Sequence, residues 1–191
     1  ASKPLWMYAA EAFSKRNDVA QLIIVISEED KETFNEKYAG NAAMLGMQAV
    51  LGGEQRAQSV LNGLQAVNDE ISMVAIHDAA RPCVAEKWID SVFGAAEKSG
   101  AAILATPVSS TLKRVSAERT ISETVSREGL WLAQTPQVFR KDLLLDAYAQ
   151  HENPSLATDE ASIVEAAGHP VAVVEGSPLN IKVTTKADMK F

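Results

Sequence analysis

The sequence predicts an α/β domain with a largely parallel sheet, because short apolar runs alternate with longer amphipathic segments. The apolar runs are continuous rather than alternating, which is typical of strands buried on both faces. The expected strands are residues 22–26, 48–51, 73–76, 101–105 and 171–174. Helical spacing of apolar residues predicts helices at 6–15, 54–67, 86–99, 141–150 and 159–167. Helices on both faces of such a sheet give a three-layer domain.

Glycines at two of the predicted helix ends support these boundaries. Gly100 and Gly168 follow the segments 86–99 and 159–167, where a residue in the left-handed conformation commonly ends a helix. We therefore expect both helices to end at these glycines.

Composition and charge limit the classes of partner. The chain of 191 residues has an ordinary fraction of apolar and charged residues, so we expect one domain over residues 1–191. Its 25 acidic and 18 basic residues give a formal net charge of -7, which argues against a nucleic-acid or membrane partner. Cys83 is the only cysteine, which excludes an intrachain disulfide and fits a reducing cytoplasm. The sequence contains no run of about 18 apolar residues, so it predicts no membrane span.

Residues 111–125 break the alternation of strands and helices. Leu112, Val115, Ile121 and Val125 surround the polar stretch 116–119, which predicts a β-hairpin. A two-stranded hairpin that projects from the body is marginally stable alone. We therefore expect residues 110–127 to form an arm, and contact with a second subunit is one way to support it.

The beginning of the sequence differs from the usual order of an open α/β domain. Such a domain usually binds its ligand beside its first strand and a glycine-rich turn. This sequence opens on the predicted helix 6–15. We therefore expect the opening strand and phosphate-binding loop to have no counterpart in the sequence.

The motif HDAARP at 77–82 follows the predicted strand 73–76. An acid and a cation here would lie at the carboxyl edge of the sheet, where a metal-bound phosphate is expected. Consecutive strand residues point to opposite faces, so we assign the metal to Asp78 and a supporting role to His77. Alternatively, Asp78 caps a turn, Arg81 is a surface cation and Pro82 begins the next helix.

The segment GGEQRAQSV at 52–60 joins a predicted strand to a predicted helix. Paired glycines let backbone N–H groups approach a flat ligand, and the start of the helix adds partial positive charge. A base or ribose could bind there. An ordinary turn explains Gly52 and Gly53 equally well.

Three later segments carry further candidates: AQTPQVF at 133–139, TDEA at 158–161 and NIKVT at 180–184. Thr158 or Asp159 also suits the N-cap of a helix, which needs no further function. Lys182 alternates with Ile181 and Val183, which predicts a late strand whose lysine meets either an anion or solvent.

Other enzyme classes lack their defining patterns. The sequence has no G-x-G-x-x-G, no G-x-x-x-x-G-K-[ST], no G-x-S-x-G and no H-E-x-x-H. Dehydrogenase, P-loop, α/β-hydrolase and zincin hypotheses are therefore not supported.

Taken together, the segments resemble the 2-C-methyl-D-erythritol 4-phosphate cytidylyltransferases in order and spacing. They are GGEQRAQSV (52–60), HDAARP (77–82), TLKR (111–114), SREGLWLAQTPQVF (126–139), TDEAS (158–162) and NIKVT (180–184). The resemblance implies a Rossmann-like nucleotidyltransferase fold whose protruding arm, residues 110–127, joins two subunits in a homodimer. It also implies Mg²⁺ as cofactor, and CTP and a sugar-alcohol phosphate as substrates.

The resemblance implies a role for individual residues. For CTP it implies that Gly53, Glu54 and Ser59 hold the cytosine and that Ala79 and Thr135 lie against the nucleotide. It also implies that Asp78 and Lys182 act at the triphosphate, where Lys182 neutralises phosphate charge. Asp78 would bind Mg²⁺ and, with Lys182, serve catalysis. For the second substrate it implies Arg81 and Thr158, together with Thr111 of the partner subunit and Arg127 of the partner subunit.

The implied reaction is attack by a phosphate oxygen of methylerythritol phosphate on the α-phosphorus of CTP, with release of pyrophosphate. The sequence departs from the family at Ser110, where an aspartate is usual, and at its two ends, where relatives continue. A ribitol-5-phosphate cytidylyltransferase and a catalytically silent nucleotide-binding protein are the alternatives. The segments TLKR and GLW favour methylerythritol phosphate.

Overall fold

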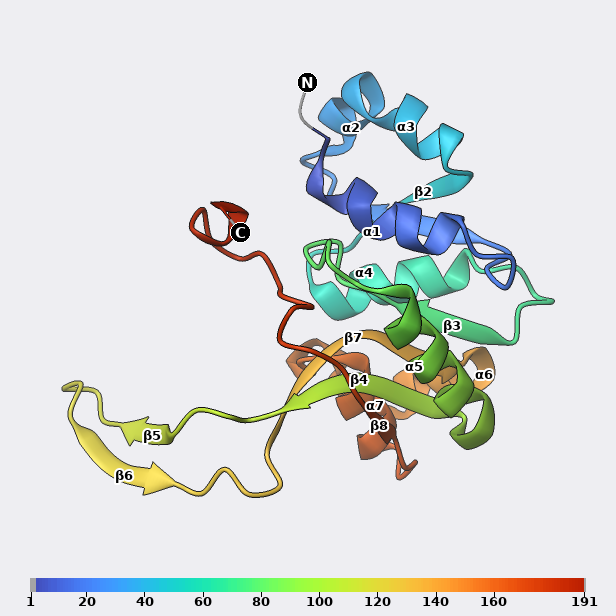
Figure 1. The fold of residues 1–191 in the computed structure, drawn as a ribbon. Coiled ribbons are helices and arrows are strands. Elements are labelled where there is room, and N and C mark those ends of the chain that lie inside the picture. The colour runs from blue at the N-terminus through green and yellow to red at the C-terminus, as the bar shows by residue number, and fades with distance from the viewer. Residues whose placement is uncertain (1–2, 191) are drawn as a thin grey trace.

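The computed structural model describes residues 3–190, which form a mixed α/β domain with a projecting hairpin (Figure 1). A four-stranded sheet has the order β3 (Met73–Ile76), β7 (Trp131–Arg140), β4 (Ala101–Pro107) and β8 (Ala172–Glu175). β7 runs antiparallel to both β3 and β4, whereas β4 and β8 are parallel. β1 (Leu22–Ile26) and β2 (Met47–Leu51) form a separate parallel pair.

Helices cover both faces of the four-stranded sheet. α5 (Glu86–Ser99) packs on one face, while α4 (Arg56–Gln65), α6 (Lys141–Gln150) and α7 (Glu160–Ala166) pack on the other. β4 is buried along its length because Ala101 and Ile103 face the second group of helices and Ala102 and Leu104 face α5. This explains why its sequence is a continuous apolar run.

The predicted helix boundaries hold closely. Gly100 ends α5 with φ 82°, and its N–H donates to the carbonyl of Ala96 at 2.7 Å. Gly168, also with φ 82°, follows α7. The left-handed conformation at both positions is the one that glycine adopts without steric cost.

Four features of the fold differ from the sequence prediction. The four-stranded sheet is not largely parallel as expected, because β7 runs antiparallel to both of its neighbours and only β4 and β8 pair in parallel. β7 was not predicted as a strand, because Gln134, Pro136 and Gln137 interrupt its apolar pattern. Residues 180–184, predicted as a strand, are irregular. The expected single sheet is divided into two: among residues 3–190, no strand of the β1–β2 pair is hydrogen-bonded to a strand of the four-stranded sheet.

The remaining elements are α1 (Leu5–Ser14), α2 (Lys31–Lys37), α3 (Ala39–Met44) and the 3₁₀ helices η1 (Pro154–Leu156) and η2 (Asp188–Lys190).

The predicted hairpin is present between β4 and β7. β5 (Leu112–Val115) and β6 (Ile121–Val125) pair antiparallel and extend away from the body (Figure 1). Most side chains of both strands are exposed. We call residues 110–127 the arm.

Within residues 3–190, every helix is too short or too polar to cross a membrane.

Candidate functional site

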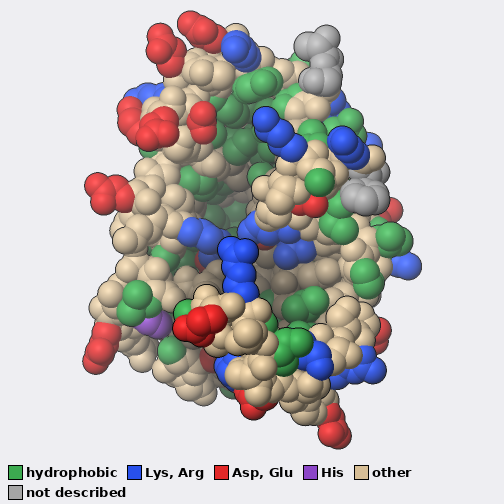
Figure 2. Space-filling view, turned by 90° about the vertical axis from the view of Figure 1, so that its left-hand side faces the viewer, with side chains coloured by type: hydrophobic (Ala, Val, Ile, Leu, Met, Phe, Trp, Pro, Cys, Tyr) green, Lys and Arg blue, Asp and Glu red, His purple; other side chains and the backbone are tan. Residues whose placement is uncertain are grey.

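A cavity of about 230 Å³ lies where the β3–α5 loop, β7, the start of α7 and the C-terminal segment meet. Three cations and two acids line it together with hydroxyl and amide groups. The lining residues are Arg56, Asp78, Arg81, Ala133, Gln134, Thr135, Gln137, Thr158, Asp159 and Lys182. In the space-filling view of Figure 2, Lys and Arg side chains gather in the hollowed centre of the face shown. Positive charge in a concave site suits a polyanionic ligand.

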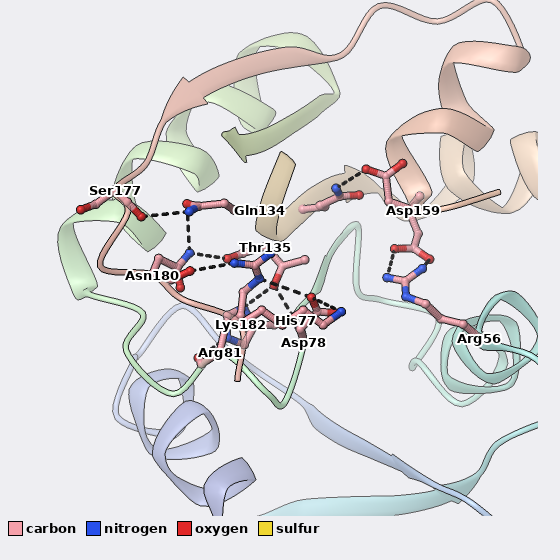
Figure 3. Close-up of polar contacts among 12 residues, drawn as sticks. Arg56, His77, Asp78, Arg81, Gln134, Thr135, Asp159, Ser177, Asn180 and Lys182 are labelled. Atoms are coloured by element: carbon pink, nitrogen blue, oxygen red, sulfur yellow. Dashed lines mark hydrogen bonds and ion pairs between the residues drawn. The ribbon is translucent and has the colours of Figure 1, made fainter. Parts of the chain in front are cut away.

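Asp78 lies between two of these cations (Figure 3). Its Oδ2 is 3.1 Å from Lys182 Nζ and 3.3 Å from Arg81 Nε. Burial alone would raise the pKa of the Asp78 carboxyl, but the hydrogen bond from Lys182 and the charges of Lys182, Arg56 and Arg81 lower it below its ordinary value. Asp78 is therefore ionised at neutral pH and available to a metal ion.

Lys182 reaches Asp78 because the C-terminal segment binds alongside the β3–α5 loop. The Val183 N–H donates to the Ala80 carbonyl at 2.8 Å, and Arg81 Nη1 donates to the Asn180 carbonyl at 2.7 Å. The Arg81 N–H in turn donates to the Asp78 carbonyl at 2.9 Å. These bonds, rather than a strand ladder, set the position of Lys182.

A buried amide network ties the same segment to β7. Asn180 Nδ2 donates to the Thr135 carbonyl at 2.9 Å and to Gln134 Oε1 at 3.3 Å. Gln134 Nε2 donates to the Ser177 carbonyl at 2.9 Å (Figure 3). Asn180 is fully buried, and these bonds satisfy the donor side of its amide, whereas its Oδ1 has no hydrogen-bond partner among the described residues.

His77 and Thr135 lie under the loop. Thr135 Oγ1 accepts from the Asp78 N–H at 3.0 Å and is 3.1 Å from His77 Nδ1, while His77 Nε2 is 3.1 Å from the Arg81 carbonyl. Burial lowers the pKa of the His77 imidazole to about 4. His77 is not a metal ligand in this geometry, because both ring nitrogens already have protein partners.

The start of α7 closes the opposite wall of the cavity. Asp159 is the N-cap, as the sequence allowed, and its Oδ1 accepts from the Ser162 N–H at 3.0 Å. Gln137 Nε2 donates to Asp159 Oδ2 at 2.9 Å. Thr158, the preceding residue, is exposed and lines the cavity.

An ion pair joins this wall to α4. Arg56 donates to both carboxylate oxygens of Glu160, at 2.6 Å and 2.8 Å, and Tyr148 Oη donates to Glu160 Oε1 at 3.3 Å. Glu160 is fully buried, whereas the Arg56 side chain is 39% exposed and lines the cavity.

The glycine-rich candidate segment forms a compact turn outside the cavity lining. The Gly53 N–H donates to Ser59 Oγ at 3.1 Å, and Ser59 Oγ donates to the Gln55 carbonyl at 3.1 Å. A Cβ atom on Gly52 would lie 2.6 Å from Ser59 Oγ, and one on Gly53 would lie 2.2 Å from Gln58 Cγ. A side chain at either position would therefore force the Ser59 or Gln58 side chain to shift. Glu54 and Ala79 are exposed.

The cavity thus brings together Asp78, Arg81, Thr135, Thr158 and Lys182 of the predicted site residues. Gly53, Glu54, Ser59 and Ala79 lie outside its lining, and Thr111 and Arg127 are exposed on the arm. The Arg127 guanidinium donates to the Ser109 carbonyl.

The sequence prediction did not assign four of the polar side chains that line the cavity: Arg56, Gln134, Gln137 and Asp159. Gln134 and Gln137 could have been identified from the sequence, because both precede the apolar pair Val138–Phe139. Polar side chains in a buried segment need hydrogen-bond partners. Arg56 gave no such signal, since an arginine in a first helical turn is usually a surface residue.

The donor set limits the kind of metal that fits. Among residues 3–190 there is no group of three or more His, Cys, Asp or Glu side chains arranged for a metal ion. Asp78 offers one ionised carboxylate beside a cavity lined with cations. This arrangement fits Mg²⁺, which binds through one or two carboxylates and takes its other ligands from substrate phosphates and water.

Comparisons with known proteins agree on one family. The sequence profile of the 2-C-methyl-D-erythritol 4-phosphate cytidylyltransferases matches residues 1–191. The 2-C-methyl-D-erythritol 4-phosphate cytidylyltransferase of Rhodopirellula baltica is 41% identical over 200 residues, covering 99% of this chain and 81% of the relative. That of Bacillus velezensis is 40% identical over 190 residues, covering 98% and 81%.

Solved structures give the same result for the fold. The crystal structure of 2-C-methyl-D-erythritol 4-phosphate cytidylyltransferase from Thermus thermophilus matches with a TM-score of 0.86 and 34% identity, over 100% of this chain and 87% of that one. The Francisella tularensis structure matches with a TM-score of 0.84 and 31% identity, over 98% and 86%. The resemblance seen in the sequence motifs is confirmed, and the chain belongs to the 2-C-methyl-D-erythritol 4-phosphate cytidylyltransferase family.

Proposed function

We propose that this chain is a cytidylyltransferase that transfers the cytidylyl group of CTP to 2-C-methyl-D-erythritol 4-phosphate, giving CDP-methylerythritol and pyrophosphate for isoprenoid biosynthesis. The observation that carries the proposal is the cluster of Asp78, Arg81 and Lys182 at one cavity, in a chain of this family. Both substrates are polyanions, so an enzyme for them needs cations and an ionised acid in one concave site.

The reaction divides the site between the two substrates. The turn of Gly53, Glu54 and Ser59 receives the cytosine, and Ala79 and Thr135 lie against the nucleotide. Lys182 neutralises phosphate charge, and its separation of 3.1 Å from Asp78 keeps the acid ionised. Asp78 would hold Mg²⁺, which supplies charge neutralisation at the triphosphate.

The second substrate binds through its phosphate. Arg81 and Thr158 contribute from this chain, together with Thr111 of the partner subunit and Arg127 of the partner subunit. An arginine fork can bind two phosphate oxygens at once. A phosphate oxygen of the acceptor forms the new bond to the α-phosphorus of CTP, and the bond from that phosphorus to the pyrophosphate oxygen breaks. The protein holds the two groups in line and forms no covalent intermediate.

A homodimer through the arm is part of this proposal. Apolar side chains are exposed on the arm and at its base: Val115, Ile121, Leu130, Trp131 and Leu132, with exposed fractions of 42–64%. A projecting hairpin with exposed apolar residues needs a covering surface. A second copy of the chain supplies that surface and also delivers the arm residues to the neighbouring site.

The location we propose is the cytoplasm, where the single exposed Cys83 would remain reduced.

Pyrophosphate release from CTP tests the proposed reaction. We expect release that depends on Mg²⁺ and on methylerythritol phosphate, with little release when ribitol 5-phosphate is the acceptor. Preference for ribitol 5-phosphate would assign the other cytidylyltransferase activity. Calorimetric binding of CTP without release in the presence of either acceptor would instead identify a silent nucleotide-binding protein.

A further inference from the structure

His77 links two of the elements that line the cavity, the β3–α5 loop and β7, and the proposed reaction gives it no role. Its Nδ1 is 3.1 Å from the hydroxyl of Thr135 on β7, and its Nε2 is 3.1 Å from the carbonyl of Arg81 in the β3–α5 loop (Figure 3). The ring lies against Phe13, with the ring centroids 5.2 Å apart. His77 therefore contacts two residues that line the cavity without lining it itself.

The partners of His77 determine the direction of both hydrogen bonds. A carbonyl oxygen only accepts, so Nε2 carries a proton and donates to Arg81. No carboxylate lies within hydrogen-bond distance of the ring among residues 3–190, and the ring packs against the apolar ring of Phe13, which favours a neutral imidazole. Nδ1 of a neutral ring with Nε2–H accepts a hydrogen bond. Thr135 must then donate its hydroxyl proton to it.

The remaining capacity of the Thr135 hydroxyl follows by counting. A threonine hydroxyl has one proton and two lone pairs. The proton goes to His77 Nδ1, and one lone pair accepts from the Asp78 N–H at 3.0 Å. One lone pair remains for a ligand in the cavity that Thr135 lines. Phosphate oxygens are themselves acceptors and cannot use it, whereas a hydroxyl group can donate to it.

We propose that His77 is a positioning residue: it directs the proton of Thr135 away from the cavity, so that Thr135 accepts a hydrogen bond from a substrate hydroxyl. The substrate hydroxyl belongs to the ribose of CTP or to the sugar alcohol, an assignment that rests on the proposed function. The same ring holds the Arg81 carbonyl in the turn where the Arg81 N–H donates to the Asp78 carbonyl. His77 thereby orients Thr135, Asp78 and Arg81 together.

The tautomer is measurable without turnover. Nitrogen-15 NMR of the histidine rings in the full chain at pH 7 should show His77 as the neutral Nε2–H tautomer, assigned by loss of its signals in His77→Gln. A signal from the Nδ1–H tautomer or from an imidazolium ring would overturn the proposal.

Two substitutions separate the two ring nitrogens. His77→Asn keeps an acceptor near the position of Nδ1, whereas His77→Gln keeps a donor near the position of Nε2. We expect kcat/KM within about threefold of wild type for His77→Asn and a drop of about tenfold for His77→Gln, the size expected for one lost hydrogen bond. Equal losses in both variants would indicate a purely structural role and contradict the proposal. His169→Asn, at an exposed histidine, is the matched control.

A double substitution tests whether His77 acts through Thr135. Thr135→Val removes the hydroxyl while keeping the shape of the side chain. In this background His77→Gln should cause almost no further loss of kcat/KM, and additive losses would contradict the proposal. Deoxyribose analogues of CTP identify the hydroxyl, because an analogue lacking it should bind wild type and Thr135→Val equally. If every analogue binds wild type and Thr135→Val with different affinities, the hydroxyl is not on the ribose. A rise in KM for methylerythritol phosphate alone in Thr135→Val then assigns the hydroxyl to the sugar alcohol.

These readouts separate failure of the inference from failure of the proposed function. Absence of pyrophosphate release by wild type would refute the proposed reaction. The NMR tautomer and calorimetric CTP binding by His77→Gln and Thr135→Val would still decide the role of His77.

Discussion

At the scale of single residues, the site depends on how burial and neighbouring charges act on ionisable side chains. Two adjacent residues respond in opposite ways to the same partly buried location. Nearby cations keep Asp78 ionised with a lowered pKa, whereas burial keeps His77 neutral with a pKa of about 4. The HDAARP motif therefore provides a charged acid that faces the cavity and a neutral base beneath it.

Replacement of Asp78 by asparagine should remove the ionised carboxylate with little change in shape. We expect kcat to fall by about a hundredfold or more, the loss typical of a well-placed electrostatic group, and the dependence on Mg²⁺ concentration to weaken. Pyrophosphate release at varied Mg²⁺ measures both effects. Asp69→Asn, at an exposed carboxylate, is the control, and unchanged turnover in Asp78→Asn would refute the assigned role.

The pKa of His77 predicts how stability depends on pH. Its ordinary value is 6.5 and its folded value about 4, so between these pH values the unfolded chain binds the proton and the folded chain does not. The free energy of unfolding should therefore fall as pH drops from 6.5 to 4, by about 3 kcal/mol from this group. Urea unfolding at several pH values should show a weaker dependence in His77→Gln than in His169→Gln. Parallel profiles would contradict the prediction.

Arg127 belongs to the arm and, by our proposal, acts on the phosphate of the acceptor bound in the other subunit. Loss of a charged hydrogen bond costs about 1.5–3 kcal/mol, so Arg127→Ala should lower kcat/KM for methylerythritol phosphate roughly tenfold to a hundredfold. Calorimetric CTP affinity should change little. Arg114→Ala removes another exposed arm arginine and serves as control. An equal weakening of CTP binding in Arg127→Ala would count against the assignment.

At the scale of secondary-structure elements, the cavity is held by contacts between segments far apart in the sequence. Gln137 on β7 holds Asp159 at the start of α7, and Arg56 on α4 holds Glu160 one residue later. The C-terminal segment is fixed to β7 and to the β3–α5 loop through Asn180. No single element contains the site, which depends on the packing of these segments against one another.

Loss of the arginine from the Arg56–Glu160 pair should destabilise this packing. Glu160 is fully buried, so Arg56→Met leaves an uncompensated buried charge and should cost about 3–5 kcal/mol in the free energy of unfolding. Arg56→Met combined with Glu160→Gln should recover much of the loss, because a neutral amide can still accept from Tyr148. Urea unfolding of both variants measures the difference. A double variant no more stable than Arg56→Met would contradict this account.

At the scale of the whole molecule, the arm is the part of a single chain whose side chains are mostly exposed. It extends from the body on the β4–β7 connection, and the residues at its base, Leu130, Trp131 and Leu132, are 42–59% exposed (Figure 1). Burial of such side chains contributes about 1.5–3 kcal/mol for each fully buried leucine. In the dimer that we propose, a second copy would cover these side chains, and its arm residues would complete the acceptor site.

Polar substitutions at the base of the arm test the dimer. Leu130→Ser combined with Leu132→Ser should shift the chain from dimer to monomer in analytical ultracentrifugation and lower pyrophosphate release in parallel. Leu156→Ser changes a leucine in η1, outside the arm, that is 78% exposed, and should leave the dimer intact. A wild-type chain that sediments as a monomer would refute the dimer, and full activity in the monomeric double variant would refute the shared site.

Much of the fold followed from local patterns in the sequence. Strands β1, β3 and β4 are apolar runs, and α5 and α6 have regular amphipathic spacing, so burial alone predicts them. β7 was missed because Gln134 and Gln137 are polar, although their partners are Ser177, Asn180 and Asp159. The predicted strand at 180–184 is absent because its backbone groups bind the β3–α5 loop instead of a neighbouring strand.

The sequence by itself determined the α/β class, the family and the hairpin, because repeated apolar spacing and motif order need no tertiary contacts to be recognised. Only the tertiary structure decided that Lys182 meets Asp78, that Arg56 binds Glu160 and that His77 is paired on both sides. Each of these contacts joins elements whose separation in space depends on packing, and the protonation of His77 depends on burial that packing creates. Local sequence patterns therefore predict neither these contacts nor the protonation of His77.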